Sequence, residues 1–226
     1  MQLSVTIPFY NEENNVTRVL TELTKELNSA KIDYEILAVD NGSRDKTSEL
    51  IDKFSKSNSR VKKVVVKINQ GYGYGILSGL ANAKGKIVGW MDGDKQISAD
   101  TLVKVYKFAA EKKEGIFKVN RVNRFDGMRR NLLGQSYNIL MQNIFGIKCK
   151  DINGCPKLFS KENLEKMNLT SKDWFLDSEV LIKATRLKLK IYEIPVIFEK
   201  RKTGKSNVYF HTTFEFIKNI IKFYLK

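Results

Sequence analysis

Two carboxylates one residue apart, Asp92 and Asp94, stand directly after a short apolar run, and the amide of Gln96 follows at the same spacing. Carboxylate and amide oxygens suit a hard divalent cation, which often bridges substrate phosphates. The other interpretation is a solvated turn, because Asp-Gly is a common turn dipeptide. The apolar run before the motif favours the cation, since a strand would deliver Asp92 to the ligand-binding edge of a sheet.

Asp40 also follows an apolar run, and its carboxylate could accept hydrogen bonds from a nucleobase N–H or a ribose hydroxyl. Its alternative role is to cap the following helix, for which Asp45 is better placed. A glycine-rich stretch, Asn69–Gly75, lacks the Gly-Lys-Ser/Thr of a P-loop. Its entry into a predicted helix would still bring backbone N–H groups near a phosphate.

The first hundred residues alternate between the apolar runs of strands and the three-to-four-residue spacing of helices. Strands are predicted at 3–7, 34–39, 61–68 and 87–91, and helices at 16–27, 46–54 and 76–83. This alternation predicts an α/β fold with a mostly parallel, Rossmann-like sheet flanked by helices. Ligands bind at the carboxyl ends of such strands, where three loops would meet: Pro8–Glu12, Asp40–Asp45 and Asp92–Gln96.

The pattern is looser beyond residue 100. Helices are predicted at 102–110, 132–145, 161–167 and 175–187, strands at 115–119 and 191–198, and a loop and strand at 151–159. Two basic loops, 118–130 and 200–206, lie between these elements. We expect one domain with a first half (1–108), a second half (109–206) and an amphipathic C-terminal helix (207–226).

The chain carries 40 Lys and Arg against 25 Asp and Glu, a net charge of +15 over 226 residues. Residues 1–100 contribute only +1 of this charge, so the surplus lies in the second half and the C-terminal segment. Such an excess predicts an anionic partner: nucleic acid, an anionic membrane or a phosphorylated substrate. The sequence has no zinc-finger spacing, RNP motif or basic zipper, which argues against nucleic acid.

The chain resembles the inverting family-two glycosyltransferases with the glycosyltransferase A fold, through Ile7–Glu12, Val39–Asp45, Asn69–Gly71, Gly85–Ile87 and Met91–Gln96. The later part resembles the subgroup that makes polyprenyl-phosphate sugars, the dolichol-phosphate mannose and glucose synthases. Its motifs there are Asp151–Phe159, Trp174–Glu179, Glu193–Val196 and Arg201–Ser206. Gly93 stands where many members have Ala, a change we expect to be harmless, and Cys155 stands where Gly is usual.

The resemblance implies transfer from a GDP- or UDP-linked sugar to a polyprenyl phosphate, with Mg²⁺ or Mn²⁺ as cofactor. Asp94 and Gln96 would ligate the metal on the diphosphate, with Asp92 beside the ribose and the metal. The nucleotide sugar would be bound by residues of the first loops: Pro8, Tyr10, Asn11, Glu12, Asp40, Asn41, Gln70 and Gly71. The acceptor phosphate would be positioned by Arg121, Arg130, Arg201, Lys205 and Ser206. The candidate catalytic residues are Asp92, Asp94, Asp177 and Glu179.

Residues 214–226 place their apolar side chains on one arc of about 200° of a helix, with lysines on the remainder. This pattern favours a helix in a membrane interface, and the alternative is packing on its own domain or on a dimer partner. The N-terminus lacks the pattern of a signal peptide, and no apolar run is long enough to span a bilayer. We therefore expect a cytoplasmic protein, peripheral on the cytoplasmic membrane face through 210–226.

Two other functions stay open. One is a soluble glycosyltransferase that acts on a glycan or protein hydroxyl, with Asp177 or Glu179 as general base. The other is a nucleotide-sugar or polyanion binding module without turnover, against which the intact pair of metal carboxylates argues.

Overall fold

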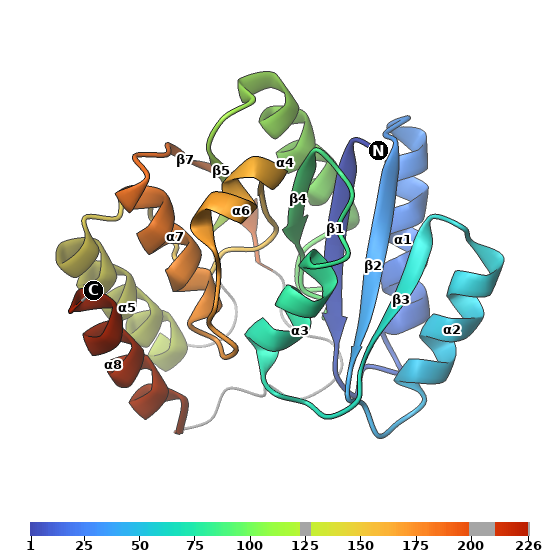
Figure 1. Ribbon diagram of the computed structural model, residues 1–226, viewed down its shortest axis with the longest axis horizontal. Helices are drawn as coiled ribbons and strands as arrows, with labels where there is room; N and C mark the ends of the chain where they lie inside the picture. The colour runs from blue at the N-terminus through green and yellow to red at the C-terminus, as the bar shows by residue number, and fades with distance from the viewer. Residues whose placement is uncertain (123–127, 199–210, 226) are drawn as a thin grey trace.

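A computed structural model of the chain describes residues 1–122, 128–198 and 211–225 (Figure 1). Within these ranges, seven strands form one sheet in the order β3-β2-β1-β4-β6-β5-β7. The strands are β1 (Leu3–Phe9), β2 (Tyr34–Asn41), β3 (Val61–Val66), β4 (Ile87–Trp90), β5 (Ile116–Val122), β6 (Lys157–Ser160) and β7 (Ile191–Ile197). Neighbours pair in parallel except at β6, which runs antiparallel to β4 and to β5. The predicted α/β fold with a mostly parallel sheet is therefore confirmed.

Helices cover both faces of this sheet. They are α1 (Val16–Ser29), α2 (Thr47–Ser57), α3 (Tyr72–Leu80), α4 (Ala99–Lys112), α5 (Met128–Phe145), α6 (Lys161–Met167), α7 (Leu176–Arg186) and α8 (His211–Tyr224). Each predicted helix is found, with ends that move by a few residues. The predicted basic loop 118–130 is wrong over much of its length, because β5 continues to Val122 and α5 begins at Met128.

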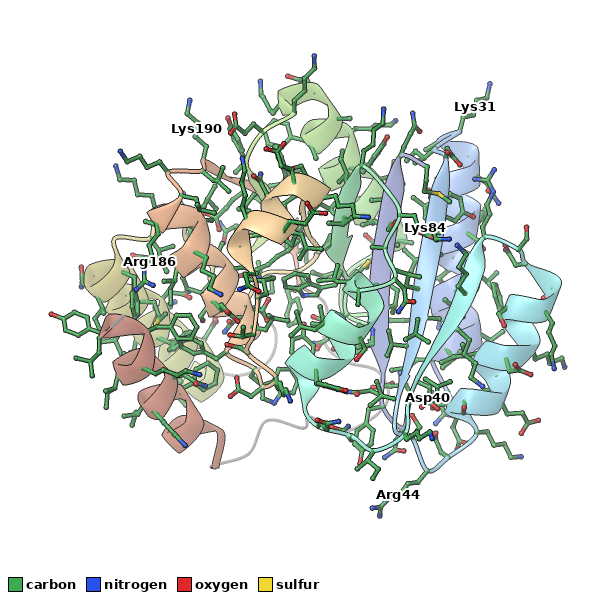
Figure 2. The ribbon with its side chains drawn as sticks, in the orientation of Figure 1. Lys31, Asp40, Arg44, Lys84, Arg186 and Lys190 are labelled. Atoms are coloured by element: carbon green, nitrogen blue, oxygen red, sulfur yellow. The ribbon has the colours of Figure 1, made fainter. Side chains whose placement is uncertain are left out.

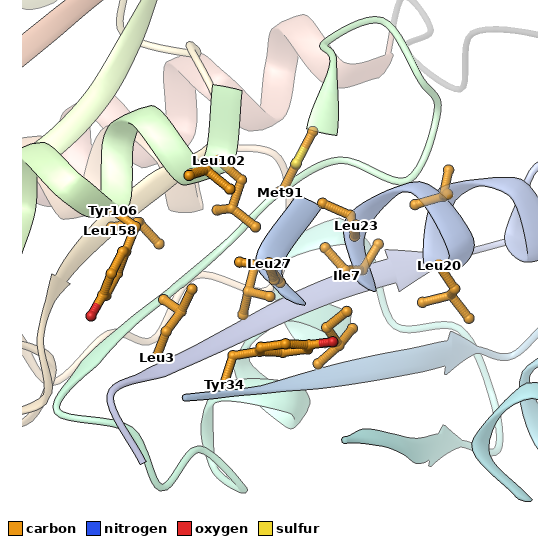
Figure 3. Close-up of a cluster of buried hydrophobic side chains, with 14 of the residues drawn as sticks. Leu3, Ile7, Leu20, Leu23, Leu27, Tyr34, Met91, Leu102, Tyr106 and Leu158 are labelled. Atoms are coloured by element: carbon orange, nitrogen blue, oxygen red, sulfur yellow. The ribbon is translucent and has the colours of Figure 1, made fainter. Parts of the chain in front are cut away.

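One apolar cluster lies between the sheet and helices α1 and α4 (Figure 3). Leu3 and Ile7 point to this face from β1, as the two-residue period of a strand requires, and they meet Leu20, Leu23 and Leu27 of α1. All five side chains are at most 1% exposed. Burying a leucine or isoleucine of this kind is worth about 1.5–3 kcal/mol, so this interface fixes β1 and the loop that follows it.

A second cluster lies on the opposite face and joins α3, α6 and α7 to the sheet. The C-terminal helix α8 belongs to it: Phe223 is buried, and Phe216 contacts both Tyr137 of α5 and Phe175 edge-on. Figure 1 shows α5 and α8 side by side, on the side of the molecule opposite α2. One face of α8 thus packs on its own domain, which was the alternative to the membrane-lying helix.

The carboxyl ends of the central parallel strands lie at one edge of the sheet. Asp40 is paired in register with Phe9, and Trp90 with Thr6, so the loops after β1, β2 and β4 leave the sheet together. Figure 2 shows Asp40 and Arg44 at this edge, whereas Lys31 lies at the opposite one. The fold therefore brings the three predicted chemical segments to one place.

Candidate functional site

The loops after β1 and β2 are tied to each other by hydrogen bonds. The Asn11 amide N–H donates to Ser43 Oγ at 3.2 Å, and the Arg44 N–H donates to Asn11 Oδ1 at 2.9 Å. The Glu12 N–H donates to Thr47 Oγ1 at 2.8 Å. These two loops, which carry the predicted nucleotide-binding residues from Pro8 to Asn41, are therefore joined into one rim.

Asp40 is buried at the end of β2, and its Oδ1 accepts a hydrogen bond from the Ser43 N–H at 2.9 Å. Asp45 accepts from the Thr47 N–H at 3.0 Å and from the Glu13 N–H at 3.1 Å. Asp45 therefore lies just before α2 and binds the N–H of its first residue, although Lys46 takes the N-cap position. Asp40 holds its own turn through one oxygen, and the assignment of Asp40 to the nucleoside stays a prediction.

The glycine-rich stretch before α3 packs against the segment Thr170–Phe175, which follows α6. A Cβ atom at Gly71 would lie 2.4 Å from the Lys172 carbonyl oxygen, and one at Gly73 would lie 2.5 Å from that of Ser171. The Tyr74 N–H donates to the Lys172 carbonyl at 2.9 Å. Asn41 Nδ2 in turn donates to the Gly71 carbonyl at 3.1 Å. These glycines therefore allow two backbones to touch, and nucleotide binding by Gln70 and Gly71 stays a prediction.

Asp92 stands two residues after the end of β4. Its Oδ1 accepts a hydrogen bond from the Tyr72 hydroxyl at 2.8 Å. Burial, together with the charges of Asp94 and Asp177, raises the pKa of Asp92 to about 7, while the bond from Tyr72 opposes that rise. The concentration of negative charge and the oxygen donors of Asp92, Asp94 and the buried Gln96 fit a hard divalent cation. Within the described ranges, His, Cys, Asp and Glu side chains form no group of three or more that could hold a metal.

Gly93 has no room for a side chain. A Cβ atom there would lie 2.6 Å from Cε1 of Phe9, whose ring is fully buried. We expected glycine at this position, where many members have alanine, to be harmless. The structure adds that an alanine in place of Gly93 would not fit in this chain. The Phe9 ring and the Asp92–Asp94 turn are fitted to each other.

We expect Gly93→Ala to destabilise the fold by about 1–3 kcal/mol, because the buried Phe9 ring must move to admit a methyl group. Urea unfolding measures the change. Phe9→Leu in the same chain is the matched control, since Gly93→Ala should cost less in the background of the smaller side chain. A Gly93→Ala protein as stable as the wild type would contradict the tight fit.

Lys157 and Asp177 form a buried ion pair next to Asp92. Lys157 is fully buried, its ammonium donates to Asp177 Oδ1, and it lies 5.7 Å from the centre of the Trp90 ring. Burial alone would lower the pKa of Lys157, but the Asp177 carboxylate outweighs it and raises that pKa above its ordinary value. Cys155 Sγ lies 3.6 Å from Asp177 Oδ1 and 3.9 Å from the Tyr72 hydroxyl. Asp177 therefore belongs to a buried network that includes Lys157 and Cys155 and that reaches the Tyr72 hydroxyl through Cys155.

Arg121 lies on β5, where it pairs with Asp151. Arg121 Nε donates to Asp151 Oδ2 at 2.7 Å, and a second guanidinium nitrogen donates to Oδ1 at 2.9 Å. Burial would raise the pKa of Asp151, but Arg121 and the nearby Lys118 outweigh it and hold that pKa well below its usual range. Lys118 is itself fully buried and donates to Glu193 at 3.2 Å. The charge of Arg121 is therefore partly compensated within the protein.

We expect Asp151→Asn to destabilise the protein by about 2 kcal/mol at pH 7, the order of a hydrogen bond to a charged group. The folded-state pKa of Asp151 lies below its unfolded value. This stabilisation is therefore fully present well above the unfolded pKa of about 3.9 and is lost progressively as the pH falls from there toward the lower folded-state pKa. The gap in urea midpoint between wild type and variant should therefore narrow from pH 7 to pH 3. Asp52→Asn, at the exposed pair with Lys56, is the control and should change little at either pH. A difference in urea midpoint that stays constant from pH 7 to pH 3 would contradict a stabilising pair between Arg121 and ionised Asp151.

Glu179 is fully buried, and its carboxylate binds the segment that precedes α7. It accepts hydrogen bonds from the Thr170 N–H at 2.9 Å and from the Ser171 N–H at 2.6 Å, and it pairs with Lys183 at 2.6 Å. Burial would raise the pKa of Glu179, but these donors, Lys183 foremost, lower it. A carboxylate so occupied is suited to holding the 170–175 segment rather than to accepting a proton. Asp177, the other acid weighed as a base, is likewise engaged, by Lys157.

Arg201, Lys205 and Ser206 lie outside the described residues, and so does the side chain of Arg130. Other residues at the site were missed, namely Tyr72, Lys157 and Trp174. The sequence did give an indication for Lys157, which stands beside the apolar Leu158 and Phe159 in a predicted strand. A lysine buried in such a strand needs an acidic partner.

The comparisons with known proteins agree on the fold. The glucosyl-3-phosphoglycerate synthase from Mycobacterium tuberculosis, solved in complex with Mn²⁺, UDP and glucosyl-3-phosphoglycerate, superposes with a TM-score of 0.72 at 18% identity. The alignment covers 99% of this chain and 78% of that one. The fold is thus that of the nucleotide-sugar glycosyltransferases of the A type.

The chain belongs to glycosyltransferase family 2, since the model of that family, "Glycosyl transferase family 2", matches residues 4–167. A dolichyl-phosphate beta-glucosyltransferase from Trichomonas vaginalis is 29% identical over 216 residues, which are 86% of this chain and 64% of that protein. One from Dictyostelium discoideum is 26% identical over 239 residues, covering 97% and 73% of the two chains. This chain thus spans about two thirds of the length of these relatives.

Proposed function

We propose that the chain transfers a sugar, with inversion, from a nucleoside diphosphate sugar to a polyprenyl phosphate. A phosphate oxygen of the acceptor attacks the anomeric carbon, and the bond from that carbon to the diphosphate breaks, so the nucleoside diphosphate leaves with the electron pair. The observation that carries the proposal is the similarity to dolichyl-phosphate glucosyltransferases along nearly the whole chain. The acidic loops gathered at one edge of the sheet are where such a family-2 protein needs them.

The donor side of the proposal uses the rim built by the first two loops. Pro8, Tyr10, Asn11, Glu12, Asp40 and Asn41 would hold the nucleoside, while Asp92, Asp94 and Gln96 would hold Mg²⁺ or Mn²⁺. When bound, the metal neutralises charge that develops on the leaving diphosphate. The oxygen donors and the raised pKa of Asp92 support this assignment, because both indicate a place where a cation would relieve repulsion.

The acceptor side uses basic residues, since a phosphate acceptor is already ionised near neutral pH and needs a position more than a base. We assign it to Arg121, Arg130, Arg201, Lys205 and Ser206. Asp151 supports the choice of Arg121, because its two hydrogen bonds fix the plane of the guanidinium. Asp177 would serve as the base if the acceptor were instead a hydroxyl.

Membrane contact belongs to the proposal as well, on the cytoplasmic face. Four apolar side chains of the C-terminal segment are more than half exposed, namely Ile217, Ile221, Tyr224 and Leu225. Beside them, α5 exposes Leu132, Leu133, Ile139 and Leu140. Two adjacent helices with apolar outer faces, with Lys218 and Lys222 exposed on α8, suit an anionic bilayer surface. In the described part of the chain, no helix has the length and apolar character needed to cross a membrane.

The paired change Ile217→Asp and Ile221→Asp is expected to abolish flotation with liposomes that contain anionic lipid, because two charges would enter the apolar face. Both side chains are more than half exposed, so the unfolding temperature should stay near that of the wild type. Asn219→Asp on the same helix is not a suitable control, since Asn219 donates to Asp173 at 2.8 Å. Lys104→Asp on α4 serves instead. Unchanged flotation of the paired variant would contradict the contact.

The deciding experiment offers UDP- and GDP-linked sugars to the full chain with Mn²⁺ or Mg²⁺, and presents polyprenyl phosphate or soluble glycans as acceptors. Product identification by mass spectrometry should reveal a polyprenyl-phosphate sugar. Transfer to glycans with no product on the lipid would instead establish the hydroxyl-acceptor alternative. Tight nucleotide-sugar binding without any product would establish the binding module.

A further inference from the structure

Tyr72, the first residue of α3, joins two parts of the molecule that the sequence separates widely. Its ring stacks on Trp174 with 4.3 Å between the ring centres and 12° between the planes. Its hydroxyl donates to Asp92 Oδ1 at 2.8 Å. One side chain therefore reaches from the 170–175 segment to the carboxylate that follows β4.

We propose that Tyr72 is a positioning residue that fixes the orientation of the Asp92 carboxylate, and that Trp174 fixes Tyr72. A single donor on Oδ1 restrains rotation of the carboxylate and directs the other oxygen, Oδ2, to a different partner. Groups that hydrogen-bond a ligating carboxylate orient it in this way. The inference rests on the proposed function, because it presupposes that Asp92 and Asp94 face a cation.

The 170–175 segment that carries Trp174 is bound before and after this residue, as a fixed support for Tyr72 requires. Glu179 binds the N–H groups of Thr170 and Ser171 at the start of the segment. Asp173 accepts from the Phe175 N–H at 2.8 Å and from Asn219 Nδ2 of α8 at 2.8 Å. The burial of Glu179 is explained by this role, since it anchors the support and leaves the reacting groups to other residues.

The neighbouring aromatic residue provides a contrast within the same turn of helix. Tyr74 has its ring 5.2 Å from Lys172 Nζ, and no hydrogen bond to its hydroxyl is found among the described residues. Tyr72 and Tyr74 thus differ in the feature that matters, the bond from the hydroxyl to an acid. Tyr74→Phe is therefore a matched control for Tyr72→Phe.

The test measures Mn²⁺ binding to the full chain by electron paramagnetic resonance, with saturating UDP in one series and GDP in the other. Tyr72→Phe keeps the stack and removes the donor, and we expect Mn²⁺ affinity to fall about tenfold or more, as for other groups that orient a metal ligand. Tyr74→Phe should bind Mn²⁺ as the wild type does. Trp174→Phe retains an aromatic support and should bind nearly as tightly, whereas Trp174→Ala should resemble Tyr72→Phe.

Two further measurements separate the role of Tyr72 from a loss of structure and from the metal site itself. The unfolding temperature of Tyr72→Phe should stay close to that of Tyr74→Phe, which separates positioning from a general loss of structure. If Asp94→Asn loses Mn²⁺ while Tyr72→Phe binds it like the wild type, the role of Tyr72 is overturned and the proposed metal site stands. If both variants bind Mn²⁺ like the wild type, the metal site of the proposed function is overturned, and this inference with it.

Discussion

Asp94→Asn is expected to lower the rate of sugar transfer by roughly two orders of magnitude or more, because charge on the leaving diphosphate would lose most of its stabilisation. The change removes a negative charge and one oxygen while keeping the size of the side chain. Gln96 follows in the same turn, and its N–H donates to Asp94 Oδ1 at 3.1 Å, so the local backbone bond is retained by the amide oxygen of the variant.

The rate is measured with the nucleotide sugar and acceptor found in the screen, over a range of Mn²⁺ concentrations. Asp100→Asn is the matched control, since Asp100 stands in the first turn of α4 and pairs only with exposed Lys104 among the described ion pairs. Its rate should equal that of the wild type. Full transfer by Asp94→Asn at every Mn²⁺ concentration would show that the metal assignment is wrong.

Lys157→Met is expected to destabilise the fold by about 3–5 kcal/mol, since it leaves the Asp177 carboxylate buried without its partner. The Asp92 carboxylate nearby adds to the repulsion. The double variant Lys157→Met with Asp177→Leu should recover much of the loss, because two apolar side chains replace the whole pair.

Urea unfolding of the two single variants and the double variant measures this coupling. Lys166→Met, which breaks an exposed pair with Glu162 on α6, should change the stability little and serves as the control. If Asp177 also acts in the site, the double variant regains stability without regaining transfer. A Lys157→Met protein as stable as the wild type would show that the buried pair of Lys157 and Asp177 does not stabilise the fold.

Local patterns were sufficient for the elements that position the site. The two-residue period of β1 and the helical spacing of α1 are explicit in the sequence, and burial of Leu3, Ile7, Leu20 and Leu23 follows from them. The acidic loops could be placed at one edge because parallel strands end together. These inferences need only neighbours along the chain and the general geometry of α/β sheets.

Contacts between residues far apart in the sequence could not be predicted from such local patterns. Lys118 and Arg121 were expected in a basic loop because charged residues are rarely buried, yet both lie on β5 with acids supplied by Asp151 and Glu193. The Tyr72–Trp174 stack is of the same kind. For α8 the apolar arc was clear, but the arc alone could not tell which part contacts the domain and which part faces outward. Only the packing of Phe216 and Phe223 answers that question.

The 170–175 segment contacts the start of α3 on one side and α8 on the other. The carbonyl oxygens of Lys172 and Ser171 lie 2.4 Å and 2.5 Å from the positions that Cβ atoms at Gly71 and Gly73 would take, so the two backbones are in close contact. On its other side, Asp173 is tied to Asn219 and Phe175 packs on Phe216 of α8. Helix α8, the 170–175 segment, Tyr72 and the acidic turn after β4 are therefore linked by one continuous series of direct contacts.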